Sequence, residues 1–307
     1  MKKILILAAA LVLSAPFAVA QEALPFIRTD RSVAVTALAG AGSASTTLGT
    51  AWSAFGNPAV SAMAQERFDV SVSWQRWTPG ETLGNNLSAG VSGKLFGRLG
   101  LQAGFATQMH SPVQTVSESG DLLSSVKPSE YIFGGGLSFA VFDFLSLGAN
   151  VRYAIQILDP STRMEALNAD IMALFRWKEL KVTAGVVGLG QTVKDVTGYS
   201  YAIPSSARLA ADYVFRIADA HSIEAALDGD YYYRSKNFGA SAGVQYAFKD
   251  MVFARAGYHY ATAGCVVPSH AAFGAGFRMF GARIELSYLC FNQALANTFS
   301  VGLGYSF

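Results

Sequence analysis

The sequence has few charged residues, and no long apolar run follows its N-terminus. Charged residues make up 14% of the 307 residues, whereas typical soluble domains contain about 25%. No stretch after residue 20 offers the roughly 18 unbroken apolar residues of a membrane-spanning helix. A charge-poor chain without such helices can still span a membrane as a closed β-barrel. In a closed barrel every backbone hydrogen bond is made between strands.

An excess of basic residues is also absent once the N-terminus is taken into account. Residues 1–20 are typical of a secretory signal peptide, with Lys2 and Lys3 before an apolar run and Ala18–Ala20 as the cleavage site. Loss of these two lysines leaves 21 basic and 21 acidic residues. Nucleic acid is therefore excluded as a partner, because its binding needs a basic face.

Cysteine is too scarce for a disulfide scaffold. The chain has two cysteines, Cys265 and Cys290, which allow one bridge in an oxidising compartment or two free thiols. Both alternatives stay open. No His, Cys and acidic residues are spaced as metal ligands, so we predict no metal and no cofactor.

Residues 21–67 do not alternate between apolar and polar positions. They are rich in Ala, Gly, Ser and Thr, and Asn57-Pro58 is a turn signal. A free tail with so few charges would be poorly solvated. We therefore predict a compact N-terminal segment that packs as a plug inside something larger.

Alternation begins at Phe68 and continues to the end of the chain, which defines residues 68–307 as a second region. Fourteen runs of about ten residues fit tilted membrane-spanning strands better than soluble ones, which average about half that length. We predict an all-β fold, a 14-stranded antiparallel transmembrane β-barrel in the bacterial outer membrane, surrounded by lipid. The predicted strands are 68–77, 85–94, 99–110, 129–140, 145–156, 164–177, 180–187, 204–215, 221–234, 237–248, 251–260, 269–279, 282–291 and 298–307.

Connections and aromatic residues support the same topology. Tight turns follow every second strand and longer polar connections follow most of the others, as in outer-membrane barrels. Outward aromatic residues collect near the two ends of the strands, with Ala, Val and Leu between them, which predicts two aromatic girdles.

The final strand, residues 298–307, has one apolar face and one face of small residues. We predict that it closes the barrel against the strand that starts at Phe68. Its terminal aromatic residues, Tyr305 and Phe307, resemble the C-terminal signal by which barrel-assembly machinery recognises its clients.

The predicted inward face carries most of the ionisable residues of the strands. One interpretation is a water-filled pore whose charges select solutes. We favour another, a lumen of paired charges that holds the N-terminal segment, because charges away from water need partners. The predicted network comprises Asp69, Arg152, Asp170, Arg176, Arg208, Asp212, Glu224, Asp228, Asp230, Arg255, Arg278, Arg283 and Glu285, with Lys94, Lys181, Arg234 and His259 on the same parity.

Catalytic signals are weak, and we do not predict an enzyme. The four histidines are scattered and serine is frequent, so no Ser–His pair stands out. The run Gly134–Gly136 lies inside a predicted strand and is not a phosphate loop. It relieves crowding there or marks a kink in the wall.

The N-terminal segment resembles the opening of the FadL-like outer-membrane barrels. The resemblance rests on Gly40 and Gly42 in an Ala/Gly run, followed by Trp52, Phe55 and Asn57-Pro58-Ala59. It implies a 14-stranded barrel whose N-terminal segment plugs the lumen. The acidic residues usual between the two parts of the motif are replaced by Ser45–Thr50, and the chain is short with small outer loops. These departures favour the PorV/PorQ-like branch, which is associated with type IX secretion in Bacteroidetes.

Two functions follow from this resemblance. The leading hypothesis is a plugged barrel that acts as a surface or secretion-associated scaffold, with a secretion-system or surface protein as its partner. The alternative is a FadL-like transporter that passes a hydrophobic ligand through a lateral opening in the wall, for which a kink at Gly134–Gly136 would be the mark.

Overall fold

The computed structural model describes residues 22–77, 84–116, 122–159, 162–194, 198–291, 295 and 297–307. The predicted signal peptide lies outside the described residues. Ahead of the barrel come a short α-helix and three 3-10 helices: η1 (Pro25–Arg28), α2 (Val33–Ala37), η2 (Thr50–Ala54) and η3 (Pro58–Met63). None of the described helices is long and apolar enough to cross a membrane.

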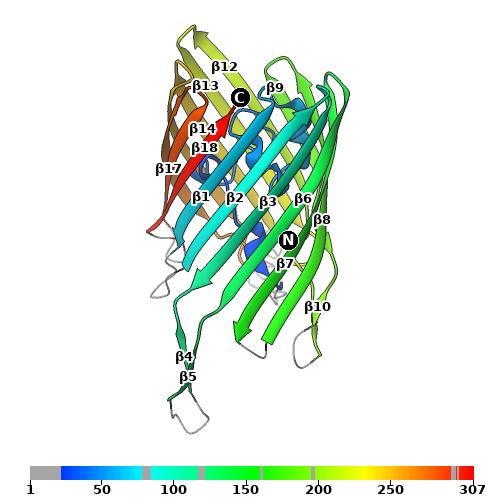
Figure 1. Cartoon of the computed structure of the whole chain (residues 1–307), viewed down its shortest axis with the longest axis vertical. Coiled ribbons are helices and arrows are strands. Elements are labelled where there is room, and N and C mark those ends of the chain that lie inside the picture. Colours follow the sequence, from blue (N-terminus) through cyan, green and yellow to red (C-terminus); the bar gives the residue numbers. More distant parts are fainter. Residues whose placement is uncertain are drawn as a thin grey trace, which may run out of the picture.

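Fourteen antiparallel strands form a closed barrel (Figure 1), which confirms the predicted fold class. The last strand pairs with the first, from Asp69 opposite Ser306 to Arg76 opposite Phe299. The barrel strands are β1 (Phe68–Trp77), β2 (Gly84–Leu95), β3 (Leu99–His110), β6 (Ser129–Phe142), β7 (Leu145–Asp159), β8 (Thr162–Trp177), β9 (Leu180–Gly190), β12 (Ser206–Ala218), β13 (His221–Tyr232), β14 (Phe238–Phe248), β15 (Val252–Ala261), β16 (His270–Met279), β17 (Ala282–Cys290) and β18 (Thr298–Ser306).

Two small hairpins lie in connections for which the sequence predicted no strands. They are formed by β4 (Val113–Val116) with β5 (Leu122–Val126), and by β10 (Val193–Lys194) with β11 (Ser200–Tyr201). The strand predicted from residue 204 begins at Ser206 instead. Pro204 has no N–H to donate to a neighbouring strand, and the preceding Ile203 is buried.

The two ends of the barrel differ. At the turn end, tight reversals join the strands, and three of them place both central residues at positive φ: Phe96-Gly97, Lys249-Asp250 and Phe280-Gly281. This geometry matches the twist of the flanking strands. The opposite end, the loop end, carries the longer connections, including the β4–β5 hairpin that projects downward in Figure 1. The last strand ends at the turn end, and so does the C-terminus.

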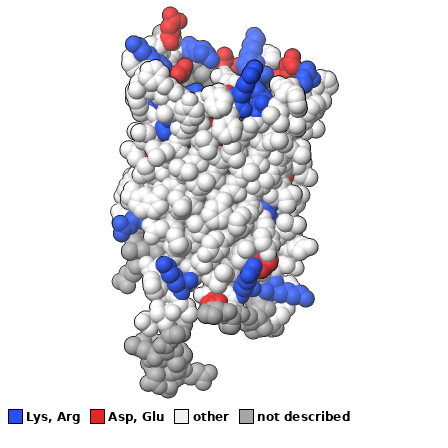
Figure 2. Space-filling model, viewed as in Figure 1, with Lys and Arg blue, Asp and Glu red and all other residues white. Residues whose placement is uncertain are grey.

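The outer wall is apolar between two charged ends. Figure 2 shows the basic and acidic side chains of one face gathered near both ends, with an uncharged band between them. Elsewhere on the outer wall, large aliphatic side chains such as Leu209 of β12 and Leu227 of β13 are 62% and 60% exposed. In water such exposure would be costly, but next to lipid it is favourable.

The C-terminal residue closes the barrel at the turn end. The carbonyl oxygen of Phe307 accepts hydrogen bonds from the N–H groups of Arg67 and Phe68, and its ring lies 5.5 Å from that of Phe68. The predicted role of Tyr305 and Phe307 as an assembly signal stays a prediction.

We expect Phe307→Ser to lower the amount of folded barrel in the membrane severalfold, because it removes the terminal aromatic signal. Quantitative blotting of heat-modifiable protein in outer-membrane fractions measures this. Phe68→Ser is the matched control, since it loses the ring contact between residues 68 and 307 but keeps the terminal Phe307. An equal loss in both variants would show that only the contact matters.

Candidate functional site

Residues 22–67 lie against the inward face of the barrel and run from one end to the other. At the loop end, the N–H of Ala23 donates to the carbonyl oxygen of Ala202, and at the turn end Arg67 bonds to Phe307. Between these points η2 packs on β2 and β3, η3 on β3, β6, β7 and β8, and α2 on β15–β18. Figure 1 shows these helices, in blue, within the ring of strands.

Glycines on the inward face allow this backbone to come close to the wall. A Cβ atom at Gly148 would lie 2.5 Å from the backbone nitrogen of Ala59, and one at Gly274 would meet the Ala37 side chain. In β18, a Cβ atom at Gly302 would lie 3.4 Å from the Cβ of Val33. On the face of small residues in the last strand, Gly302 thus leaves room for α2, whereas Gly304 leaves room for the Arg283 side chain.

The motif residues hold the segment in its shape. The Oδ1 of Asn57 accepts from the N–H of Ala59 and caps η3, in which Pro58 occupies the first position. The Nδ2 of Asn57 donates to the Ser43 carbonyl (2.8 Å) and to the Thr183 hydroxyl (2.9 Å). One side chain therefore ties two parts of the segment to β9.

The remaining motif residues make close contacts of their own. Gly40 and Gly42 have φ angles of 88° and 113°, which suit glycine. Trp52 is buried, and the ring of Phe55 lies where Gly104 and Gly134 leave room for it. These glycines belong to β3 and β6, so the aromatic residues of the segment fit gaps in the wall.

Most of the predicted lumen charges form ion pairs. Two pairs are almost completely buried: Arg152 with Asp170 at 2.6 Å, and Lys181 with Asp212 at 2.9 Å. The others join Arg208 to Asp230 (2.8 Å), Arg255 to Glu285 (3.1 Å), Arg283 to Asp69 (2.6 Å) and Arg278 to Glu66 (2.7 Å). The segment supplies Glu66 and also Arg28, which lies 2.8 Å from Asp230. The sequence analysis did not single out these two residues.

Two wall carboxylates bind the segment through neutral groups. Asp228 accepts from the N–H groups of Gly42 (2.7 Å) and Ser43 (3.2 Å). Glu224 accepts from the hydroxyls of Ser45 (2.5 Å) and Thr47 (2.8 Å). Hydroxyl residues thus stand where the resemblance led us to expect acids, and they face a carboxylate that acids would repel.

Arg176 lies apart from this network. It is near the turn end, where it donates to the carbonyl oxygen of Asp143 at 2.9 Å. Lys94 also donates to a carbonyl oxygen, that of Ala64. These two inward cations therefore bind backbone rather than wall carboxylates.

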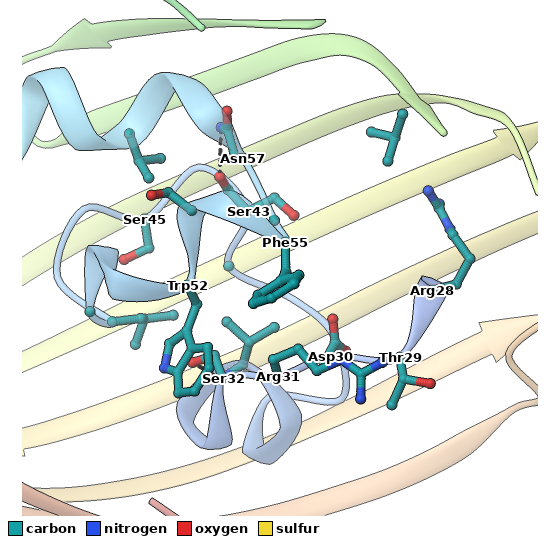
Figure 3. Close-up of a pocket in the computed structure, with 18 of the residues that line it drawn as sticks. Arg28, Thr29, Asp30, Arg31, Ser32, Ser43, Ser45, Trp52, Phe55 and Asn57 are labelled. Atoms are coloured by element: carbon teal, nitrogen blue, oxygen red, sulfur yellow. Dashed lines mark hydrogen bonds between the residues drawn. The ribbon is translucent and has the colours of Figure 1, made fainter. Parts of the chain in front are cut away.

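Several cavities lie between the segment and the wall in the described part of the chain, and two of them meet near the loop end. The lumen cavity, of about 80 Å³, is enclosed by residues 27–60 of the segment together with Arg152, Val187 and Arg208. Figure 3 shows this cavity with Trp52, Phe55, Asp30 and Arg31 around it, and the Asn57–Ser43 hydrogen bond at its edge.

The loop-end cavity is larger, about 350 Å³. Its apolar lining comes from Phe26, Trp77, Val266, Val267, Pro268 and Leu289, and its polar lining includes Asp30, Asn86, Gln108, His110 and Glu130. An apolar cavity with a few convergent polar groups is the usual form of a small-molecule site. The two cavities share Arg28, Thr29 and Asp30.

The segment places ionisable groups at the junction of the cavities. Burial raises the pKa of the Asp30 carboxyl, although nearby arginines oppose this shift. Burial lowers the pKa of Arg31 to about 10, against the opposing effect of the Glu130 charge. Arg31 stays protonated at neutral pH.

Catalytic groups do not converge in the described part of the chain. The Ser241 hydroxyl lies 2.8 Å from His259 Nδ1, a pair that the sequence could not single out, but it lies equally close to the Ala39 carbonyl. A hydroxyl that donates to this carbonyl is not activated as a nucleophile. Among the described residues, no group of three His, Cys, Asp or Glu side chains is placed to hold a metal ion. Both cysteines are free.

No protein-family model and no curated protein matches the sequence. Solved structures do match the fold. The toluene transporter TodX of Pseudomonas putida has a TM-score of 0.55 at 15% identity, over 86% of this chain and 97% of its own. The monoaromatic hydrocarbon channel CymD gives 0.62 at 12% identity, over 90% and 97%. A FadL homologue of Pseudomonas aeruginosa gives 0.51 at 12% identity, over 90% and 98%.

The chain has the fold of the FadL-like channels. This fold fits a location in the bacterial outer membrane, and the matched proteins are channels rather than enzymes. They give no support to the PorV/PorQ-like branch. A kink at Gly134–Gly136, the predicted mark of a lateral opening, is not seen, because β6 pairs with β3 and β7 without a register shift there. Gly134 instead leaves room for Ala54 and Phe55.

Proposed function

We propose that this chain is a channel for hydrophobic small molecules, which bind first in the loop-end cavity and then cross the outer membrane. The observation that carries the proposal is that cavity, with its aromatic and aliphatic lining at the end of the barrel opposite the tight turns. The similar channels TodX and CymD, described as carrying toluene and monoaromatic hydrocarbons, support it.

The path that we propose runs along the lumen, beside the segment. The lumen cavity shares Arg28, Thr29 and Asp30 with the loop-end cavity. It shares Leu48 and Gly49 with a third cavity, of about 20 Å³, that contains Glu66 near the turn end. Residues 22–67 therefore act as a plug with small spaces along it, and a local movement at residues 42–49 would join them.

Uptake of radiolabelled toluene by cells that contain or lack the protein tests the channel. We expect faster uptake with the protein, and a severalfold loss in Val267→Asp, which puts a carboxylate into the apolar lining. Val113→Asp is the matched control, since Val113 lies on the exposed β4–β5 hairpin, outside the cavity lining. Equal uptake with and without the protein would contradict a channel function.

A disulfide tests whether the segment occupies the lumen as a plug. Disulfide-bonded Cβ atoms lie about 3.5–4.5 Å apart, and the Val33 Cβ lies 3.4 Å from a Cβ built at Gly302. In a background with Cys265→Ser and Cys290→Ser, we expect Val33→Cys with Gly302→Cys to cross-link in the oxidising periplasm, as measured by mass spectrometry. Val35→Cys with Gly302→Cys is the control and should stay reduced, because Val35 lines the lumen cavity instead. Cross-linking in neither variant would contradict the plug.

A separate experiment, cross-linking in cells, tests the scaffold hypothesis. A PorV/PorQ-like scaffold would give a covalent complex with a surface or secretion protein after cross-linking in cells, and unchanged toluene uptake. The comparisons support the channel better than this scaffold.

A further inference from the structure

Glu130 is a buried carboxylate that lines the loop-end cavity. It lies at the start of β6, inward of Tyr131, and is only 6% exposed. Its Oε1 accepts from Gln156 Nε2 at 2.7 Å and lies 3.8 Å from His110 Nε2. Its other oxygen, Oε2, is buried and has no hydrogen-bond partner within the described chain.

Other polar atoms of this lining are also unsatisfied, and they too accept hydrogen bonds. The Oδ1 of Asn86, 4% exposed as a residue, has no partner among the described residues, nor has the Thr298 hydroxyl. Both residues line the same cavity, as does the carboxylate of Asp30. Leaving such acceptors without a donor costs about 1–3 kcal/mol for each group, and more for a charged one.

The basic side chains in the described lining of this cavity already have partners, whereas Arg31, which lines the neighbouring lumen cavity, keeps one buried Nη1 without a partner among the described residues. Arg28, the one arginine among the described residues of the cavity lining, lies 2.8 Å from Asp230. His270 lies 2.8 Å from the Pro268 carbonyl through its Nδ1. Trp77 and His110 pack edge to face, with ring centroids 6.2 Å apart, and offer an apolar surface beside Glu130. The cavity lining therefore combines aromatic faces with residues whose acceptor oxygens have no donor among the described residues.

We propose that the loop-end cavity selects apolar molecules that carry a hydrogen-bond donor, an O–H or N–H group on a ring or short chain, and that Glu130 is the acceptor. A donor on the ligand would satisfy Oε2, while the apolar body lies against Trp77, Phe26 and Val267. A carboxylate ligand would place its charge beside Glu130 and Asp30. The inference rests on the proposed channel function and names its substrate class.

Calorimetric titration of the full-length, detergent-solubilised protein with four small aromatic probes tests this selection. The probes are p-cresol, benzylamine, toluene and p-toluate, which share size and shape but differ in the donor and the charge. We expect p-cresol and benzylamine to bind at least about tenfold more tightly than toluene, because a hydrogen bond to a charged group is worth about that factor or more. We expect p-toluate to bind most weakly.

Two variants assign the preference to Glu130. Glu130→Leu should remove the advantage of p-cresol over toluene, measured as the ratio of the two affinities in that variant. Glu130→Gln keeps the shape but removes the charge, so benzylamine should lose about tenfold in affinity. Glu179→Gln is the matched control, because that residue lies beside the tight turn after β8, far from the cavity lining, and its side chain is 44% exposed. Circular dichroism verifies that each barrel is folded.

The outcomes separate this inference from the channel itself. Toluene binding as tightly as p-cresol, or an unchanged ratio in folded Glu130→Leu, would overturn the donor selection and leave a hydrocarbon channel standing. Binding of none of the four probes would overturn the cavity as a ligand site, and with it both proposals. A ratio that disappears only in the Glu130 variants supports the inference.

Discussion

Replacing Arg152 by leucine is expected to destabilise the barrel by about 3–5 kcal/mol, since removal of one partner of a buried ion pair leaves the other charge unpaired. The side chains of Arg152 and Asp170 are 1% and 0% exposed. Arg152 also donates to the carbonyl oxygens of Ile27 and Phe55, so the substitution frees two groups of the segment. Urea unfolding in detergent, followed by tryptophan fluorescence, measures the change.

A double substitution isolates the unpaired charge as the cause. Arg152→Met with Asp170→Leu removes both charges, and we expect it to recover most of the lost stability. Arg163→Leu is the exposed control, because Arg163 pairs with Glu165 at the rim and exposed pairs contribute about 0–1 kcal/mol. If Arg152→Leu and Arg163→Leu had the same effect, the buried pair would not be a main support of the lumen.

The strands of the wall could be predicted from the sequence because the alternation of outward and inward side chains depends only on neighbouring residues. Lipid on one side and the lumen on the other impose a period of two on every strand, and that period shows in the residue order. It placed β3 at its observed bounds and β1 likewise. It misplaced the start of β12, which begins after Pro204, at Ser206.

The contacts inside the lumen could be predicted only in part. Parity shows which charges face inward, but partners depend on register and on the course of the segment. Arg208 lies opposite Asp230 in the β12–β13 register. Arg283 instead reaches Asp69 across β18, from β17 to β1. No sequence spacing indicates that contact.

The loop-end cavity was missed for a similar reason. Its lining joins the ends of several strands with the connection at Val266–Pro268 and with η1. One signal was present, since Glu130 alternates with the outward Tyr131 and Phe133 and must therefore face inward. Only the fold shows that this carboxylate meets Trp77 and Phe26 around an open space.

Removing Glu224 and Asp228 together is expected to turn a closed barrel into one that conducts ions. Both carboxylates hold residues 42–49, which lie between two glycines at positive φ, Gly42 (113°) and Gly49 (94°). In Glu224→Ala with Asp228→Ala, the N–H groups of Gly42 and Ser43 and the hydroxyls of Ser45 and Thr47 lose their acceptors. Each loss costs about 1–3 kcal/mol in the closed state.

Movement of residues 42–49 would join spaces that are now separate. Leu48 and Gly49 line both the lumen cavity and the cavity near the turn end, so their displacement connects the two. Planar-bilayer recordings should show discrete ion currents for the double variant and few or none for the unmodified chain. The matched control is Glu179→Ala with Asp219→Ala, which removes two carboxylates from the turn end and should stay closed.

Apolar packing, rather than the hydrogen bonds to Glu224 and Asp228, is the alternative explanation for what holds residues 42–49 in place. Leu48 belongs to a buried cluster with Ala34, Leu38, Ala41 and Ala226, and that cluster opposes displacement of the loop. If the folded double variant stays silent in the bilayer, packing rather than the two carboxylates keeps the lumen closed. Leu48→Ala would then be the variant that conducts. If neither variant conducts but toluene still enters cells, the path does not pass between Leu48 and the wall.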